Sequence, residues 1–203
     1  MVTRLFLVRH GETEWNAAHR IQGQTDVPLN EQGLRQASAV AAYLAAESLT
    51  AVYASNLSRA RQTAEAIAAV HGLPVHLAPE LREVDFGEWE GLDEAAIAAR
   101  FPEEYRLWRE DSLRHRPPGG ETIAALRARA AQVYDRVVAA HAGETVALVG
   151  HGGSIRALVL HAIGLPLEAY SRLRMRNAAV SLVEIGDRGP VLARFNHTCF
   201  LEE

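Results

Sequence analysis

The chain has 203 residues, of which 48% are hydrophobic, and a formal net charge of -4 at pH 7. This length supports one globular domain with a sizeable core, and the acidic balance gives no electrostatic reason to expect nucleic acid or an anionic membrane as a partner. All 21 basic residues are arginine, which excludes mechanisms that need a catalytic or phosphate-binding lysine.

Short apolar runs alternate with helical patterns along most of the chain. The predicted strands are at 5–8, 51–53, 75–77 and 145–149, with a final strand pair at 179–185 and 191–196. The predicted helices are at 31–47, 57–70, 121–141 and after 153, and 93–110 is expected to form one or two helices. This alternation predicts an α/β fold with a mostly parallel sheet covered on both faces. We expect a single domain over residues 1–203, with a small helical segment like a cap at about 93–118.

Two of the predicted strands end in a histidine. The first strand runs into Arg9-His10-Gly11, and the strand at 145–149 runs into Gly150-His151-Gly152. Ligands bind beyond the carboxyl ends of parallel strands, so the two histidines meet if their strands are neighbours. Arg59 stands at another strand-to-helix junction and is expected to face the same crevice.

Two arginines, two histidines and helix N-termini make a pocket suited to a phosphoryl group. We expect the helices that begin near Leu57 and at Gly152-Gly153 to point N–H groups at it. A metal site is the alternative for two histidines, but no His-x-x-x-His or His-x-Asp pattern accompanies them, and the arginines would repel a cation. The sequence therefore predicts no metal and no cofactor.

Phosphoryl transfer to or from an alcohol also needs an acid for the leaving oxygen. The segment 80–91 is acidic, and Glu83 is the best placed by context. A partly desolvated carboxyl group beside an anion has a reason to keep its proton near neutral pH. Spacing alone does not separate Glu83 from Asp85, Glu88 or Glu90.

These motifs resemble the histidine phosphatase superfamily, which includes the cofactor-dependent phosphoglycerate mutases. The similarity covers nearly the whole chain and implies a three-layer α/β/α sandwich of the phosphoglycerate mutase-like type around a mostly parallel mixed sheet, in which the final strand pair could place one strand antiparallel. The segments that carry it are Leu7–Asn16, Gln22-Gly23, Leu29–Gly33, Ser55–Ala64, Glu83, Gly87–Gly91, Gly119–Glu121 and Gly150–Gly152.

The resemblance also implies a role for each site residue. His10 is the nucleophile that becomes phosphohistidine, and Glu83 is the proton donor. The residues implied to hold the phosphoryl oxygens are Arg9, Arg59 and His151, and those implied to line the pocket are Asn16, Gln22, Gly23 and Gly152.

Departures from the mutase branch favour a phosphatase. The lysine that mutases use for the far end of the substrate is absent, Glu110 follows Arg109 where mutases pair a second arginine, and no long insertion precedes the helix at 121–141. We expect a metal-independent phosphomonoesterase that acts on small phosphorylated metabolites. The alternatives are a 2,3-bisphosphoglycerate-dependent phosphoglycerate mutase and a non-catalytic domain that binds a phosphorylated ligand.

The sequence leaves the substrate open. The arginines of 106–116 either read a carboxylate or second phosphate of the substrate or belong to a solvated helix face. We expect a small-molecule phosphomonoester as the ligand, and no nucleic acid or membrane partner. Without a secretory signal pattern or an apolar stretch of membrane-spanning length, we expect a cytoplasmic protein. A homodimer is compatible with the sequence, which does not decide the oligomeric state.

Overall fold

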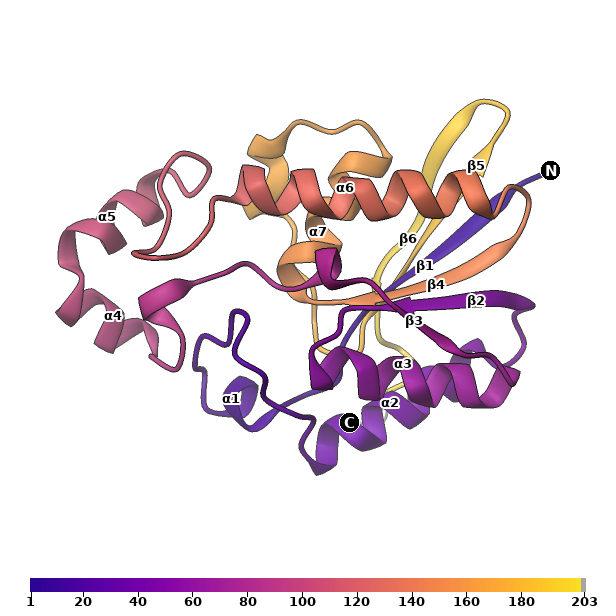
Figure 1. Cartoon of the computed structure of the whole chain (residues 1–203), viewed down its shortest axis with the longest axis horizontal. Coiled ribbons are helices and arrows are strands. Elements are labelled where there is room, and N and C mark those ends of the chain that lie inside the picture. Colours follow the sequence, from indigo (N-terminus) through magenta and orange to yellow (C-terminus); the bar gives the residue numbers. More distant parts are fainter. Residues whose placement is uncertain (202–203) are drawn as a thin grey trace.

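A computed structural model describes residues 1–201 and has a six-stranded sheet at its centre (Figure 1). The strand order is β3-β2-β4-β1-β5-β6. Strands β1 to β4 run parallel, β5 is antiparallel to β1, and β6 is antiparallel to β5, so β5 alone of these six strands opposes the others. The predicted mixed sheet with one antiparallel strand is confirmed. The strands are β1 (Thr3–Arg9), β2 (Leu49–Ala54), β3 (Val75–Leu77), β4 (Thr145–Gly150), β5 (Val180–Gly186) and β6 (Gly189–His197).

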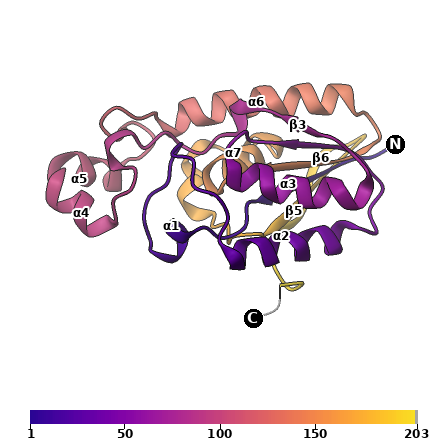
Figure 2. The same ribbon diagram turned by 60° about the horizontal axis from the view of Figure 1, so that its bottom comes forward.

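Helices cover both faces of this sheet, as Figures 1 and 2 show, with α2 and α3 on one side and α6 and α7 on the other. This is the predicted three-layer α/β/α sandwich. In residues 1–201, no helix is both long and apolar enough to cross a bilayer. The helices are α1 (Glu14–Ala17), α2 (Glu31–Leu44), α3 (Ser58–His71), α4 (Glu94–Arg100), α5 (Pro102–Glu110), α6 (Ile123–Ala140) and α7 (Gly152–Ala162), with 3₁₀ turns at Pro79–Leu81, Gly87–Trp89 and Leu167–Arg172.

The structure differs from the predicted elements at four short helices and one helix end. Helix α1 and the 3₁₀ turns at Pro79–Leu81, Gly87–Trp89 and Leu167–Arg172 are absent from the prediction, because none is long enough to show a hydrophobic period. Helix α1 is instead held by a capping box between Thr13 and Asn16. Helix α2 ends at Leu44 rather than near 47, where the amide of Glu47 bonds back to the carbonyl oxygen of Leu44 and tightens the turn into β2.

The two sides of β1 show how the core fixes the site. Leu5 and Leu7 pack against α6 and α7, whereas Phe6 and Val8 pack against α2 and α3. All four side chains are at most 1% exposed. Because a shift by one residue would turn both apolar faces toward the wrong layer, this alternation fixes the register of β1 and hence the place where its last residue, Arg9, leaves the sheet.

Helices α4 and α5 lie beyond the carboxyl ends of the parallel strands (Figure 1). The arginines of α5 pair with acids of the same segment. Arg106 contacts Glu103 at 2.8 Å and Glu110 at 2.6 Å, and Arg109 contacts Glu94 at 3.1 Å. These side chains are more than half exposed, which favours the solvated-face interpretation over substrate reading. The single-domain division and a cap role for 93–118 stay predictions.

Candidate active site

His10 and His151 lie side by side because their strands are neighbours. Strands β1 and β4 pair in parallel with Arg9 opposite Gly150, and each histidine is the next residue along its chain. The ring centroids are 5.1 Å apart, and the rings are inclined by 60°. The two residues are 2% and 0% exposed. The structure therefore brings the two strand-end histidines together at the carboxyl ends of β1 and β4.

Hydrogen bonds assign the neutral form of each imidazole. Nδ1 of His10 is 2.6 Å from the carbonyl oxygen of Gly11, which can only accept, so Nδ1 carries the proton and Nε2 keeps its lone pair. Nδ1 of His151 accepts from Nε of Arg59 at 3.1 Å, which leaves Nε2 to donate to the hydroxyl of Ser55 at 2.9 Å. Burial and the nearby positive charge of Arg59 hold the pKa of both histidines well below the usual value.

Two guanidinium groups bring buried positive charge to these rings. Arg59 is fully buried and donates to the carbonyl oxygens of Thr25 at 2.8 Å and Gly23 at 2.7 Å. Arg9 donates to the carbonyl oxygen of Met175 at 2.5 Å, and its Nε is buried without a partner among residues 1–201. Burial lowers the pKa of each arginine to about 10, so both remain charged at neutral pH.

Neither of these cations has a carboxylate partner. Within the described part of the chain, every ion pair involves other residues. Carbonyl oxygens satisfy some N–H groups of Arg9 and Arg59, and Glu83 acts on both charges only from beyond ion-pair distance. Because an unpaired buried charge is costly, an anion that enters the site would be strongly favoured.

Glu83 faces the same cleft as Arg9. Its Oε1 accepts from the amide of Val84 at 2.9 Å, and its Oε2 accepts from the amide of Gly153 at 3.0 Å, at the N-terminus of α7. Glu83, Arg9, Gly152 and Gly153 line a cleft of about 350 Å³. A side chain at position 153 would overlap the Glu83 carboxylate, so the approach requires glycine there.

Geometry separates Glu83 from the other three acids of its segment. Glu90 accepts from the amides of Gln24 and Thr25, and so ties down another loop. Asp85 accepts from the amide of Gly87 at 2.9 Å, and Glu88 is exposed. Within residues 1–201, Glu83 is the acid of this segment that lines the cleft with Arg9.

The expectation that the N-terminus of α3 points N–H groups at the pocket stays a prediction, and the first amide of this helix already has a partner. The amide of Ser58 donates to Oδ1 of Asp26 at 2.7 Å, and the hydroxyl of Ser58 donates to Oδ2 at 2.8 Å. Asp26 therefore caps this helix from a distant loop, which the local sequence around Leu57 does not reveal. At α7 the helix N-terminus does reach the site, where the Gly153 amide binds Glu83.

The remaining predicted residues form a chain of contacts beside the histidines. Gln22 accepts from the hydroxyl of Thr13 at 3.0 Å, and the carbonyl oxygen of Gly23 binds Arg59. Oδ1 of Asn16 accepts from the Thr13 amide at 3.2 Å. The last predicted lining residue, Gly152, lies in the cleft against the Arg9 guanidinium.

Sequence reasoning missed two residues that hold the histidines. Ser55 bonds His151, and Nδ2 of Asn177 lies 3.3 Å from the carbonyl oxygen of His10 and 3.2 Å from that of Gly11. Ser55 directly follows β2, the neighbour of β4, so the strand-end rule could have found it. Asn177 precedes β5, and its place at this edge follows only from the antiparallel direction of β5.

The lowered pKa values predict that acid destabilises the ligand-free protein. Unfolding returns both imidazoles to water, where their pKa is about 6.5, so below that pH the unfolded state binds up to two more protons than the folded state. The contribution of His10 and His151 to the free energy of unfolding has its full value above pH ~6.5. Below that pH it should fall by up to about 2.7 kcal/mol per pH unit. Urea unfolding at about pH 7.5 and about pH 5.5 measures this change.

A His10→Gln, His151→Gln double variant is the control, because it keeps every other histidine. It should lose less stability than the unchanged protein on the same acidification. Equal losses in the two proteins would contradict the assignment of buried neutral imidazoles.

Comparison with known proteins agrees with this site. The description "Histidine phosphatase superfamily (branch 1)" belongs to the family model that matches residues 5–198. Phosphoserine phosphatase 1 of Hydrogenobacter thermophilus is 33% identical over 202 residues, covering 100% of this chain and 96% of that protein. The probable phosphoglycerate mutase GpmB of Yersinia pestis is 40% identical over 185 residues, covering 89% of this chain and 84% of that protein.

A solved structure shares this fold over nearly the whole length of both chains. A mycobacterial glucosyl-3-phosphoglycerate phosphatase in complex with VO3 has a TM-score of 0.88 and 35% sequence identity, covering 96% of this chain and 99% of that one. The predicted fold and the predicted family of phosphatase enzymes are thereby confirmed. The chain belongs to the histidine phosphatase superfamily.

Proposed function

We propose that this enzyme is a phosphomonoesterase that transfers the phosphoryl group first to His10 and then to water. The observation that carries the proposal is a buried, neutral His10 with an available Nε2 beside two guanidinium groups, the buried Arg59 and the half-buried Arg9, that form no ion pair within residues 1–201. The family and its phosphatase-named members support it. Small phosphorylated metabolites are the proposed substrates, and the cytoplasmic location and a homodimer stay predictions.

In the first step, the lone pair on Nε2 of His10 attacks phosphorus in line with the ester oxygen. The P–N bond forms as the P–O bond to the alcohol breaks, and the leaving oxygen takes that electron pair. Glu83, in its acid form, donates a proton to this oxygen. Arg9, with its unpartnered Nε, stabilises the charge on the other phosphoryl oxygens together with Arg59.

In the second step, water attacks the phosphohistidine. Glu83, now a carboxylate, accepts the proton of the attacking water as the new P–O bond forms. The P–N bond breaks, its electron pair returns to Nε2, and inorganic phosphate leaves. Without ligand, Nε2 of His151 donates to Ser55 while Nδ1 accepts from Arg59, and we propose that this Nε2–H turns to a phosphoryl oxygen when the substrate binds. Asn16, Gln22, Gly23 and Gly152 are proposed to complete the pocket.

Metal independence is a further part of the proposal. Within residues 1–201, no group of three or more His, Cys, Asp or Glu side chains is arranged to hold a metal ion. The positive charge that a phosphoryl group needs is available from Arg9 and Arg59. Turnover should therefore be unchanged when EDTA is present, and the activity assays of the variants include it.

Replacing the nucleophile should stop turnover without unfolding the protein. We expect His10→Ala to show no phosphate release, because the neighbouring imidazole of His151 has both ring nitrogens bonded, to Arg59 and Ser55. A rapid quench with labelled substrate should trap phosphate on the unchanged enzyme. The adduct should survive alkali but not acid, as a phosphoramidate does, and an adduct with the opposite stability would contradict the mechanism.

Removing the proton donor should affect substrates according to their leaving group. We expect Glu83→Gln to lower kcat/KM by roughly 10²–10⁴-fold for phosphoserine, whose alkoxide needs a proton. The loss should be smaller for p-nitrophenyl phosphate, whose leaving group hardly needs one. Glu88→Gln is the matched control, since Glu88 is exposed in the same segment. Equal losses for the two substrates in Glu83→Gln would show that Glu83 is not the donor.

A mutase is the second candidate, because one relative carries that name at 40% identity. A mutase must hold its dephosphorylated intermediate and exclude water until the phosphoryl group returns. The cations available for that purpose in α5 are paired with Glu94, Glu103 and Glu110. With 3-phosphoglycerate and catalytic 2,3-bisphosphoglycerate, we expect net release of inorganic phosphate, with 2-phosphoglycerate as a trace product. Sustained interconversion of the two monophosphates without phosphate release would favour the mutase.

A further inference from the structure

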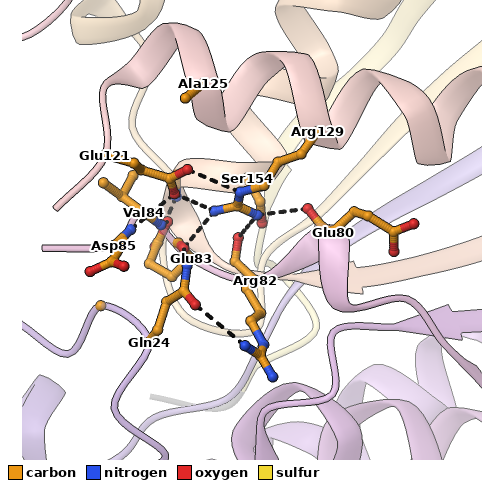
Figure 3. Close-up of polar contacts among 12 residues, drawn as sticks. Gln24, Glu80, Arg82, Glu83, Val84, Asp85, Glu121, Ala125, Arg129 and Ser154 are labelled. Atoms are coloured by element: carbon orange, nitrogen blue, oxygen red, sulfur yellow. Dashed lines mark hydrogen bonds and ion pairs between the residues drawn. The ribbon is translucent and has the colours of Figure 1, made fainter. Parts of the chain in front are cut away.

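We propose that Arg129 and Glu121 form a positioning pair that holds the backbone around Glu83, so that the Glu83 carboxyl group faces the leaving oxygen. The proposal rests on the role of Glu83 as proton donor. Neither residue of the pair lines the cleft, and Figure 3 shows how they surround the segment that carries Glu83. Both act through Glu83 rather than on the substrate.

Arg129, on α6, binds three backbone carbonyl groups of this segment at once. Its Nη1 donates to the carbonyl oxygens of Glu80 and Arg82, each at 2.6 Å, and its Nη2 donates to that of Glu83 at 2.7 Å (Figure 3). The side chain is 20% exposed. A single planar group therefore fixes the chain at Glu83 and at the residues before it.

Glu121 fixes the same segment on the other side of Glu83. Its Oε1 accepts from the amide of Asp85 at 3.0 Å, and its own amide donates to the carbonyl oxygen of Asp85 at 2.9 Å. Glu121 also accepts from Arg129, at 3.2 Å from Nε and 2.5 Å from Nη2. Together the two side chains hold the backbone immediately before and after the proposed donor.

The segment needs this support because it has no regular secondary structure. Residues 82–86 lie between two 3₁₀ turns and belong to no helix or strand. Val84 is 1% exposed and packs with Ile123 and Leu126 of α6, whereas its neighbour Glu83 lines the cleft. The side-chain donors of Arg129 on α6 thus take the place of the backbone hydrogen bonds that a helix or strand would provide.

The pair also keeps the charge near Glu83 balanced. Without Glu121, the guanidinium of Arg129 would stand beside this segment as an unpaired charge. Arg129 contributes to the lowered pKa of His151, so its charge is felt at the site. Glu121 offsets that charge while keeping the donors of Arg129 on the backbone.

The position of Glu83 matters because its carboxylate already bridges two backbone amides. It accepts from Val84 in its own segment and from Gly153 at the start of α7. If the segment shifts, the carboxyl group moves relative to α7 and to the phosphoryl site on β1 and β4. Misplacement of a catalytic group by about 1 Å can cost about 10²-fold in rate.

The test compares two leaving groups in Arg129→Ala. We expect kcat/KM for phosphoserine to fall roughly 10- to 100-fold and that for p-nitrophenyl phosphate to fall less than about threefold. Inhibition by vanadate should change little, because Arg9, Arg59 and both histidines remain. The ratio of the two kcat/KM values is measured on one preparation, so a loss of folded protein cancels from it. Equal losses for the two substrates would overturn the proposal.

Arg136→Ala is the matched control on the same helix. Arg136 also contacts Glu80, at 3.3 Å, but through the carboxylate and from a side chain that is 53% exposed. Its kcat/KM ratio should stay within about twofold of the unchanged enzyme. If Arg129→Ala does not yield folded protein, Glu121→Gln tests the same pair and should shift the ratio in the same direction.

A double variant separates this proposal from the one on which it rests. If Arg129 acts through Glu83, adding Arg129→Ala to Glu83→Gln should lower kcat/KM for phosphoserine less than about threefold further. A full additional loss would overturn the positioning role. An unchanged leaving-group ratio in Glu83→Gln alone would instead overturn the donor role of Glu83, whatever Arg129→Ala does.

Discussion

Positive charge that is held away from water without a carboxylate partner determines much of the architecture around His10. Arg9 and Arg59 are tied to carbonyl oxygens of Gly23, Thr25 and Met175, which orient the guanidinium groups without neutralising them. The charge therefore stays available for an anion. It also disfavours protonation of the two buried histidines, so the groups proposed to bind phosphate also keep His10, the proposed nucleophile, neutral.

The parts of this site that the sequence predicts are those that depend on local pattern. Apolar runs followed by polar residues place His10 and His151 at strand ends, and the parallel pairing of β1 with β4 then joins them. Ser55 follows the same rule after β2. Asn177 and Asp26 do not, because each reaches the site through a segment that only tertiary structure brings near. Helix α1 is likewise set by side-chain caps rather than by hydrophobic period.

The proposed proton donor, too, is selected by tertiary contacts rather than by local sequence pattern. Glu83, Asp85, Glu88 and Glu90 lie within eight positions of one another, and their spacing gives no reason to prefer one. Contacts with other segments decide their places. Glu90 accepts from backbone amides of the loop that carries Gly23, whose carbonyl oxygen binds Arg59. Arg129 and the segment before α6 hold the backbone around Glu83, and the Glu83 carboxylate lines the cleft. A sequence pattern can indicate an acidic loop near a phosphate pocket, but long-range hydrogen bonds select the residue.

Because this chain has no lysine, arginine side chains both hold backbone segments together and supply the positive charge at the candidate site. Arg129 and Arg156 spread their N–H groups over several partners that hold the fold together, and Arg156 bonds Gly152, Leu173 and the hydroxyl of Tyr170. A lysine ammonium, with its donors on one atom, could not bridge such separated acceptors. Arg129 is also paired with the Glu121 carboxylate, whereas Arg9 and Arg59 form no ion pair within residues 1–201. The number of arginines near a strand end therefore overstates the capacity to bind an anion, and what marks the proposed phosphate pocket is guanidinium charge that forms no ion pair with a carboxylate.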